Sequence, residues 1–230
     1  AVFTVAGDID IDETREMIDY YFSAIPDKPK PEKVFPVEPD ITQETRVQEY
    51  DPNIQIPAIL LNYRTPPMQS REARVLDLIS TYLSTGKSSK LYKKLVDEQK
   101  IALEVQAVSL PLEEYGIYAI LALPLGDTPL DQLKTEIDEE IVALKSDLIS
   151  EKDYQKLQNI YENNFVNSNA SIQGVATSLS QYYLFYNDTN LINSSIEIYK
   201  SITREEIRDV ASKYLNDNQR VVMDLSLIHI

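Results

Sequence analysis

Apolar residues recur along this chain with two periods, and each period predicts one kind of element. Alternation with a period of two predicts β-strands, whereas spacings of three and four predict amphipathic helices. Strands are expected at residues 2–6, 46–51, 56–63, 101–109, 115–123 and 220–228. Helices are expected at residues 10–25, 70–83, after Ser88, and at 130–144, 150–167, 171–187, 196–202 and 203–214. Because pairs of strands alternate with pairs of helices, the sequence predicts an α+β fold with a mainly antiparallel sheet and helices packed on one face.

The stretch from Leu83 to Val105 predicts the end of one helix, a turn with glycine, a second helix and the start of a strand. Ser88 is the expected N-cap of the second helix, since a serine oxygen can accept bonds from the first free backbone N–H groups. In the strand at residues 101–109, the period of two places Leu103 on one face together with Ile101, Val105, Ala107 and Ser109. Further N-caps are expected at Asp10, Ser70, Ser150 and Thr203.

Prolines separate the first predicted helix from the rest of the chain, at Pro26, Pro29, Pro31, Pro36 and Pro39. Such spacing excludes helix and favours an extended, semi-rigid linker. We therefore expect residues 1–26 to be the terminal strand and helix of a preceding repeat, residues 27–45 to be the linker, and residues 46–230 to form a C-terminal domain. The apolar start, without a charged leader, predicts that the chain is a piece of a longer polypeptide.

Composition narrows the chemistry that this chain can carry. The net charge of −15 disfavours nucleic acid and anionic membranes as partners, because both repel an acidic surface. There is no cysteine and a single histidine, His229, so no thiolate site and no zinc site with two histidines can form within one copy. No apolar run reaches the roughly 20 residues that span a bilayer. We expect no cofactor in this chain.

Three short motifs have a functional interpretation besides a structural one. The run Gly86-Lys87-Ser88 resembles part of a phosphate-binding loop, but Thr81 stands where that loop needs another glycine, so a helix–helix turn is favoured. The acidic runs at residues 138–140 and 113–114 could supply acid/base pairs, although adjacent carboxylates on a polar face are usually solvated. The tyrosines within residues 182–186 could stack on a ligand, but such clusters more often belong to a core or an interface.

Four stretches, in the same order, resemble the insulinase/pitrilysin family of zinc peptidases, to which the processing-peptidase-like proteins belong. The first runs from Val2 to Asp10 and continues at Tyr21-Phe22-Ser23-Ala24-Ile25-Pro26. The second comprises Leu83, Gly86 and Ser88-Ser89-Lys90-Leu91-Tyr92 with Leu95. The third covers residues 96–105, and the fourth is Tyr115-Gly116-Ile117-Tyr118. The resemblance extends over nearly the whole chain. The chain is similar to the second, non-metal repeat of the family.

This resemblance implies two related domains that close around a peptide chamber, with zinc held by a His-x-x-Glu-His helix in the other repeat. No such motif is present here, so the resemblance places no catalytic residue and no metal ligand in this chain. Many members have an Arg and a Tyr that hold the substrate carbonyl, and these positions fall on Val96 and Leu103. Neither side chain can donate a hydrogen bond, so we expect no substrate-binding residue at these positions.

The resemblance thus predicts the zinc-free C-terminal domain of a zinc metalloendopeptidase, inactive by itself, that closes the chamber and packs on the catalytic domain. That catalytic domain would lie in the same polypeptide or in a homologous partner chain, with peptide as substrate. The alternative is a non-catalytic homologue that acts as a scaffold or assembly subunit. A half-shell of either kind should expose an apolar patch where its mate packs. The compartment stays unknown; for a bacterial source, the periplasm or cell envelope is compatible.

Overall fold

The computed structural model describes residues 2–29, 31, 32, 34, 36 and 38–226. It contains two compact units, residues 1–38 with 163–194 and residues 39–162 with 195–230. The predicted division into residues 1–26, 27–45 and 46–230 stays a prediction.

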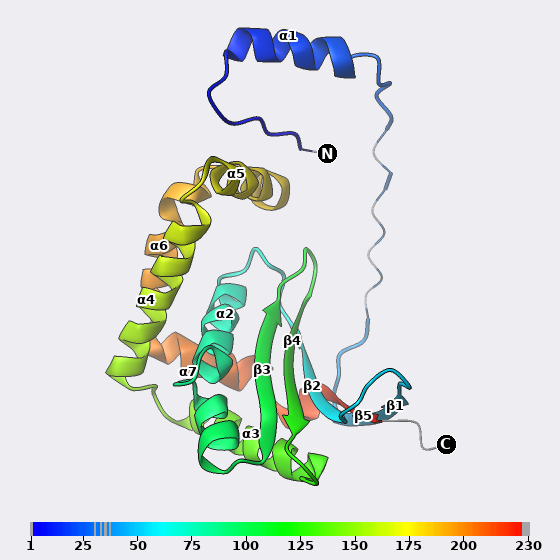
Figure 1. Ribbon diagram of the computed structural model, residues 1–230, viewed down its shortest axis with the longest axis vertical. Helices are drawn as coiled ribbons and strands as arrows, with labels where there is room; N and C mark the ends of the chain where they lie inside the picture. Colours follow the sequence, from blue (N-terminus) through cyan, green and yellow to red (C-terminus); the bar gives the residue numbers. More distant parts are fainter. Residues whose placement is uncertain (1, 30, 33, 35, 37, 227–230) are drawn as a thin grey trace. The chain divides into compact units, whose positions relative to one another are not determined.

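Five strands of the second unit form one sheet in the order β1-β5-β2-β4-β3 (Figure 1). Their bounds are Thr45–Tyr50 for β1, Ala58–Thr65 for β2, Ala102–Leu110 for β3, Gly116–Pro124 for β4 and Arg220–Ser226 for β5. The β2–β4, β2–β5 and β3–β4 pairs are antiparallel, whereas β1 runs parallel to β5. The predicted α+β fold with a mainly antiparallel sheet is therefore confirmed.

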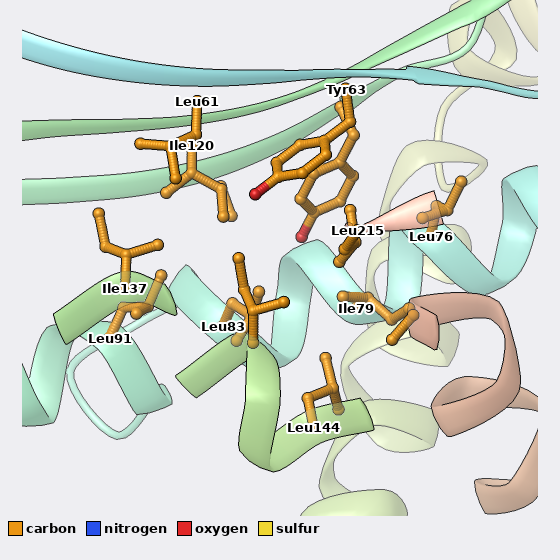
Figure 2. Packing of buried hydrophobic residues seen from close by; sticks show 14 of the residues in the cluster. Leu61, Tyr63, Leu76, Ile79, Leu83, Leu91, Ile120, Ile137, Leu144 and Leu215 are labelled. Atoms are coloured by element: carbon orange, nitrogen blue, oxygen red, sulfur yellow. The ribbon is translucent and has the colours of Figure 1, made fainter. Parts of the chain in front are cut away.

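Three helices of this unit cover one face of the sheet: α2 at Arg71–Ser84, α3 at Leu130–Ser146 and α7 at Arg204–Tyr214. Figure 2 shows Leu61 and Ile120 pointing from the strands toward Leu83, Ile137 and Leu144 on the helices. These five side chains are almost completely buried and belong to one hydrophobic cluster. A period of two on the strands and of three to four on the helices places apolar side chains against each other, which explains this packing.

Most of the predicted N-cap residues are found at the start of a helix. The Asp10 carboxylate accepts bonds from two backbone N–H groups of the first turn of α1, Ile11–Phe22. Ser70 caps α2, and Ser150 accepts a bond at the start of α4, Glu151–Ser168. Thr203 and Glu206 form a reciprocal capping box for α7. A short 3₁₀ helix, η2 at Asp217–Gln219, leads from α7 into β5.

The first unit contains α1, α5 at Ile172–Tyr186, and the parts of α4 and α6 that fall within residues 163–194. The strand predicted at residues 2–6 is wrong: these residues have no strand geometry. A strand requires a hydrogen-bonded neighbour, and no described residue pairs with this stretch. Two helix boundaries differ most from prediction: α1 ends at Phe22 rather than near residue 25, and α6 spans Leu191–Lys200 rather than beginning at residue 196.

Candidate functional site

Residues 92–104 depart from regular backbone geometry three times. Tyr92–Glu98 form η1, a π-helix, in which the Gln99 N–H donates to the Lys94 carbonyl over 2.9 Å. Lys100 has a positive φ of 55°, which is uncommon for a residue with a side chain. The register between β3 and β4 then shifts between Ala102 and Glu104. π-Helices and β-bulges recur at functional sites, so this segment is the first candidate.

The same segment contains the two positions that the family resemblance singled out. Val96 lies within η1, is half-buried and packs against the hydrophobic core. Leu103 is the extra residue of the bulge, and 49% of its surface is exposed. The prediction that Leu103 shares the buried face of Val105 is therefore wrong, because a bulge shifts the alternation by one residue. The correspondence of Val96 and Leu103 to the family's substrate-binding pair stays a prediction.

Lys94 links η1 to α3 by ion pairs with three carboxylates. Its Nζ lies 2.8 Å from Glu139, 2.9 Å from Glu136 and 3.3 Å from Glu140. Burial alone would lower the pKa of Lys94, but its hydrogen bonds to these carboxylates raise that pKa above the ordinary value. Two members of the acidic run at residues 138–140 are thus bound in ion pairs. They are neither merely solvated, as expected, nor arranged as an acid/base pair.

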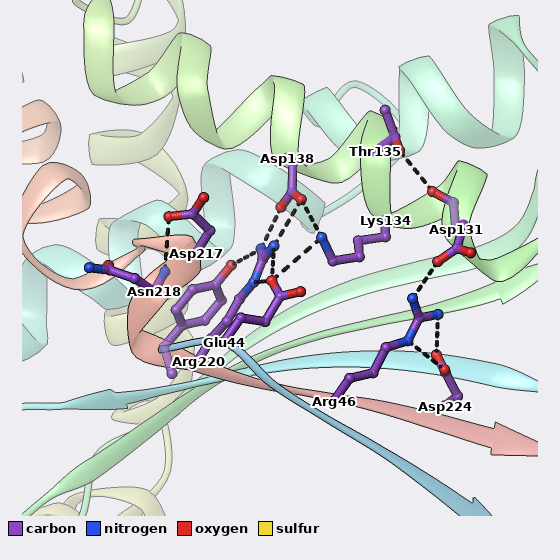
Figure 3. Close-up of polar contacts among 11 residues, drawn as sticks. Glu44, Arg46, Asp131, Lys134, Thr135, Asp138, Asp217, Asn218, Arg220 and Asp224 are labelled. Atoms are coloured by element: carbon purple, nitrogen blue, oxygen red, sulfur yellow. Dashed lines mark hydrogen bonds and ion pairs between the residues drawn. The ribbon is translucent and has the colours of Figure 1, made fainter. Parts of the chain in front are cut away.

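Asp138, the first member of that run, belongs to a second ionic cluster around Arg220 (Figure 3). The Arg220 side chain is only 2% exposed, and it donates to both Asp138 oxygens, at 2.5 and 2.9 Å. It also binds Glu44 at 2.8 Å and the Tyr63 hydroxyl at 2.9 Å. Burial raises the pKa of Tyr63 to about 12, against the lowering effect of Arg220. Lys134 lies 3.1 Å from Asp138 and completes a cluster with balanced charge.

The turn at residues 86–88 connects two helices, which agrees with the favoured interpretation of this motif. Gly86 has a φ of +78°, a conformation that glycine adopts without strain. Ser88 is not the N-cap: its hydroxyl accepts a 2.7 Å bond from Lys156, and the helix starts at Lys90. The helix begins later than predicted because Ser89 closes the turn by donating to the Gly86 carbonyl over 2.7 Å. A helix, α2, precedes this turn, whereas a phosphate-binding loop follows a strand.

The other predicted candidates do not assemble into a reactive site. The rings of Tyr182 and Tyr186 lie 6.0 Å apart on α5, a helix without buried residues. The acidic pair at residues 113–114 lies in the exposed turn between β3 and β4. His229 is outside the described residues. Within the part of the chain that the structure describes, no three His, Cys, Asp or Glu side chains are grouped as metal ligands. No described helix has both the length and the apolar character to cross a bilayer.

A surface cavity of about 530 Å³ opens near the end of β2. Its charged side chains already have partners within the protein. Arg64 donates to the Pro39 carbonyl over 3.1 Å and lies over the Tyr115 ring, and Lys213 binds Glu72 at 2.7 Å. A ligand that bound Arg64 or Lys213 would have to compete with these internal contacts.

The face of the sheet opposite the three helices is the largest feature that the motifs did not indicate. Its positions are half-buried or exposed, yet most are apolar: Leu60, Val108, Leu110, Ile117, Ala119, Leu121, Leu123, Val221, Met223 and Leu225. They are contiguous, because Leu60 pairs with Leu121 on one side and with Met223 on the other. We call this set the open face. A strand that is apolar on both faces appears in the sequence as a continuous apolar run. Such runs in β2 and β4 are the sequence signal for the open face.

A sheet with one apolar face covered by helices and the other uncovered is characteristic of a domain that packs against a further domain. The family model described as "Peptidase M16 inactive domain" matches residues 1–161. The chain therefore belongs to this family, the inactive C-terminal domains of insulinase/pitrilysin zinc proteases.

Known proteins similar to this chain agree with that assignment. The zinc protease PqqE of Helicobacter pylori is 23% identical over 98% of this chain and 51% of its own length. The crystal structure of a protease from Helicobacter pylori has a TM-score of 0.84, with 22% identity over 96% of this chain and 54% of that one. A peptidase M16 inactive domain from Pseudomonas fluorescens has a TM-score of 0.79, with 15% identity over 97% of this chain and 52% of that one. The chain thus spans about half the length of these relatives.

Proposed function

We propose that this chain is the zinc-free half of a zinc metalloendopeptidase, which closes the peptide chamber and packs on the catalytic domain. The catalytic domain would lie in the same polypeptide or in a homologous partner, and zinc would be bound there. Membership of the inactive-domain family supports this proposal, as does coverage of 51% of the length of the relative PqqE.

The observation that carries the proposal is the open face. A half-shell without its mate is expected to expose an apolar patch, and ten apolar side chains of four neighbouring strands form one here. From strand spacing and rise, the patch covers roughly 400 Å². A stable complex of separate proteins buries about 800 Å² per partner, so this face alone is small for a free dimer. A covalently tethered domain needs less area, because tethering raises its effective concentration.

The test is reconstitution with the polypeptide that carries His-x-x-Glu-His, encoded in the same gene or in a homologous one. This chain, that polypeptide and their mixture are assayed for bound zinc and for cleavage of a fluorogenic peptide. We expect no zinc and no cleavage with this chain alone, and cleavage by the mixture. Stoichiometric zinc in this chain alone would refute the proposal, as would a catalytic half whose full activity does not depend on this chain.

The aliphatic side chains of Val96 and Leu103 favour the second candidate, a scaffold subunit without catalysis. The double variant Val96→Arg with Leu103→Tyr distinguishes the two within the reconstituted mixture. If these positions face the substrate carbonyl, the variant should raise kcat, because both new side chains can donate hydrogen bonds to a developing oxyanion. Two results would support the scaffold function. One is that no polypeptide with His-x-x-Glu-His accompanies this chain, and the other is that the reconstituted mixture never cleaves peptide. Thermal unfolding of the variant controls for damage to half-buried Val96.

A further inference from the structure

The last residues of the Pro-rich segment and the first residues of β1 are bound to the domain by charge. Glu44 accepts from Arg220 at 2.8 Å and lies 3.5 Å from Lys134 on α3. Two residues later, Arg46 donates to both oxygens of Asp224, at 2.7 and 3.0 Å, and to Asp131 at 2.5 Å. Figure 3 shows the two clusters side by side, between the strands and α3.

Apolar packing contributes little to the attachment of β1. Val47 is its one half-buried residue, and its other five residues are exposed. Among the described strands it pairs with β5 alone, in parallel register, and parallel pairing is slightly weaker per residue than antiparallel pairing. Few apolar contacts and solvent-exposed backbone bonds characterise segments that open locally, without global unfolding.

The two clusters differ in their exposure to water. In the inner cluster, the side chain of Arg220 is 2% exposed and that of Glu44 is 32% exposed. In the outer cluster, the side chain of Arg46 is 39% exposed and that of Asp131 is 72% exposed. Asp224, the other partner of Arg46, is only 10% exposed. Salt screens exposed pairs much more than buried ones, so rising ionic strength should weaken the Arg46–Asp131 pair most.

We propose that residues 39–50 form a strap that opens from β5 as a unit while β5, β2, β4 and β3 stay folded. Glu44 and Arg46 hold the middle of the strap closed, and the Arg64 bond to the Pro39 carbonyl holds its first residue. If the proposed function holds, opening of the strap frees the segment that leads toward residues 1–38. The strap itself is a property of this chain alone and does not depend on that function.

Hydrogen exchange measured by mass spectrometry on the 230-residue chain tests the strap. The variants are Glu44→Gln, which keeps the side-chain size, and Arg46→Gln, which shortens the side chain; each removes one charge. Glu49→Gln is the matched control, because Glu49 is exposed on the same strand and no ion pair involving it is found among the described residues. We expect exchange in β1 to rise about tenfold or more in both variants, as charge-assisted bonds are the strong ones, and to stay unchanged in the control.

Exchange in β2 and β4 should stay slower than exchange in β1 in every variant, and 1 M NaCl should speed exchange in β1 of the wild-type chain. Two results would overturn the proposal. One is equal β1 exchange in the wild-type chain, both variants and the control. The other is β1 exchange that always matches that of β4, which would mean that the strand opens only when the whole sheet unfolds. Neither result bears on peptidase activity, so failure of the strap and failure of the proposed function are separable.

Discussion

Replacing Arg220 with methionine removes the most deeply buried charge of the sheet while nearly keeping its volume. In the wild-type chain the guanidinium binds Asp138, Glu44 and Tyr63. After Arg220→Met, the two carboxylates face each other with Lys134 as their remaining cation. Removing one partner of a buried ion pair costs about 3–5 kcal/mol. Because Asp138 and Glu44 are 29% and 32% exposed, we expect the lower end, about 3 kcal/mol.

Urea unfolding at pH 7 measures this loss as a change in the free energy of unfolding. Arg208→Met is the control, because Arg208 pairs only with its exposed neighbour Asp209 among the contacts described, at 2.7 Å. Exposed pairs of this kind contribute at most about 1 kcal/mol. Adding Asp138→Asn and Glu44→Gln to Arg220→Met should recover part of the loss, because replacing a whole buried ionic group is often nearly neutral.

The loss should also depend on pH. Burial alone would raise the pKa of Asp138, but Arg220 and Lys134 lower it below its ordinary value of 3.8. A carboxylate with a lowered pKa in the folded state stabilises the protein above its unfolded pKa, and this contribution disappears as pH falls through the folded pKa. The gap between wild type and Arg220→Met should therefore narrow below about pH 4. A loss under about 1 kcal/mol at pH 7, or a gap that widens in acid, would refute the reasoning.

Three further predictions concern single side chains. Asp77 accepts a 3.3 Å bond from the Tyr199 hydroxyl, and burial raises the pKa of its carboxyl group. Ionisation of Asp77 therefore destabilises the folded state as pH rises above the pKa that this group has in the unfolded chain. Asp77→Asn should raise the unfolding temperature at pH 7 but not at pH 3, and equal shifts at both would contradict this. Gly116→Ala would place a methyl group against the Thr65 hydroxyl oxygen and should cost about 1–3 kcal/mol; an unchanged urea midpoint would contradict this cost. Leu91→Ala should cost about 2–5 kcal/mol, whereas Leu103→Ala, in the exposed bulge, should cost under about 1 kcal/mol; similar costs would mean that Leu103 is buried after all.

Most of the fold could be predicted from the sequence, because local patterns determine the elements. Apolar spacings of three and four predicted α3 from five positions: Leu130, Leu133, Ile137, Ile141 and Leu144. The last four are buried and Leu130 is half-buried. The capping box of Thr203 and Glu206 is formed as expected. Family membership was also readable, since its signature lies in short stretches whose order the sequence preserves.

Tertiary structure alone decided the features on which the proposals rest. A strand at residues 2–6 was predicted from its run of apolar residues, but strand formation depends on a neighbour that no local pattern can supply. The bulge that exposes Leu103 inserts one residue into the pairing with β4, and alternation along one strand contains no trace of its partner's register.

The ionic clusters are the clearest example of this limit. Glu44 and Arg220 are 176 positions apart in the chain, and Arg46 and Asp224 are 178 apart. By themselves these residues are ordinary charges in an acidic protein, and charge pattern predicts only a soluble surface. The sequence thus determined the helices, most of the strands and the family, because short-range periodicity encodes them. Folding decided which charges meet and which apolar face stays uncovered, because those depend on strand order and register across the whole sheet.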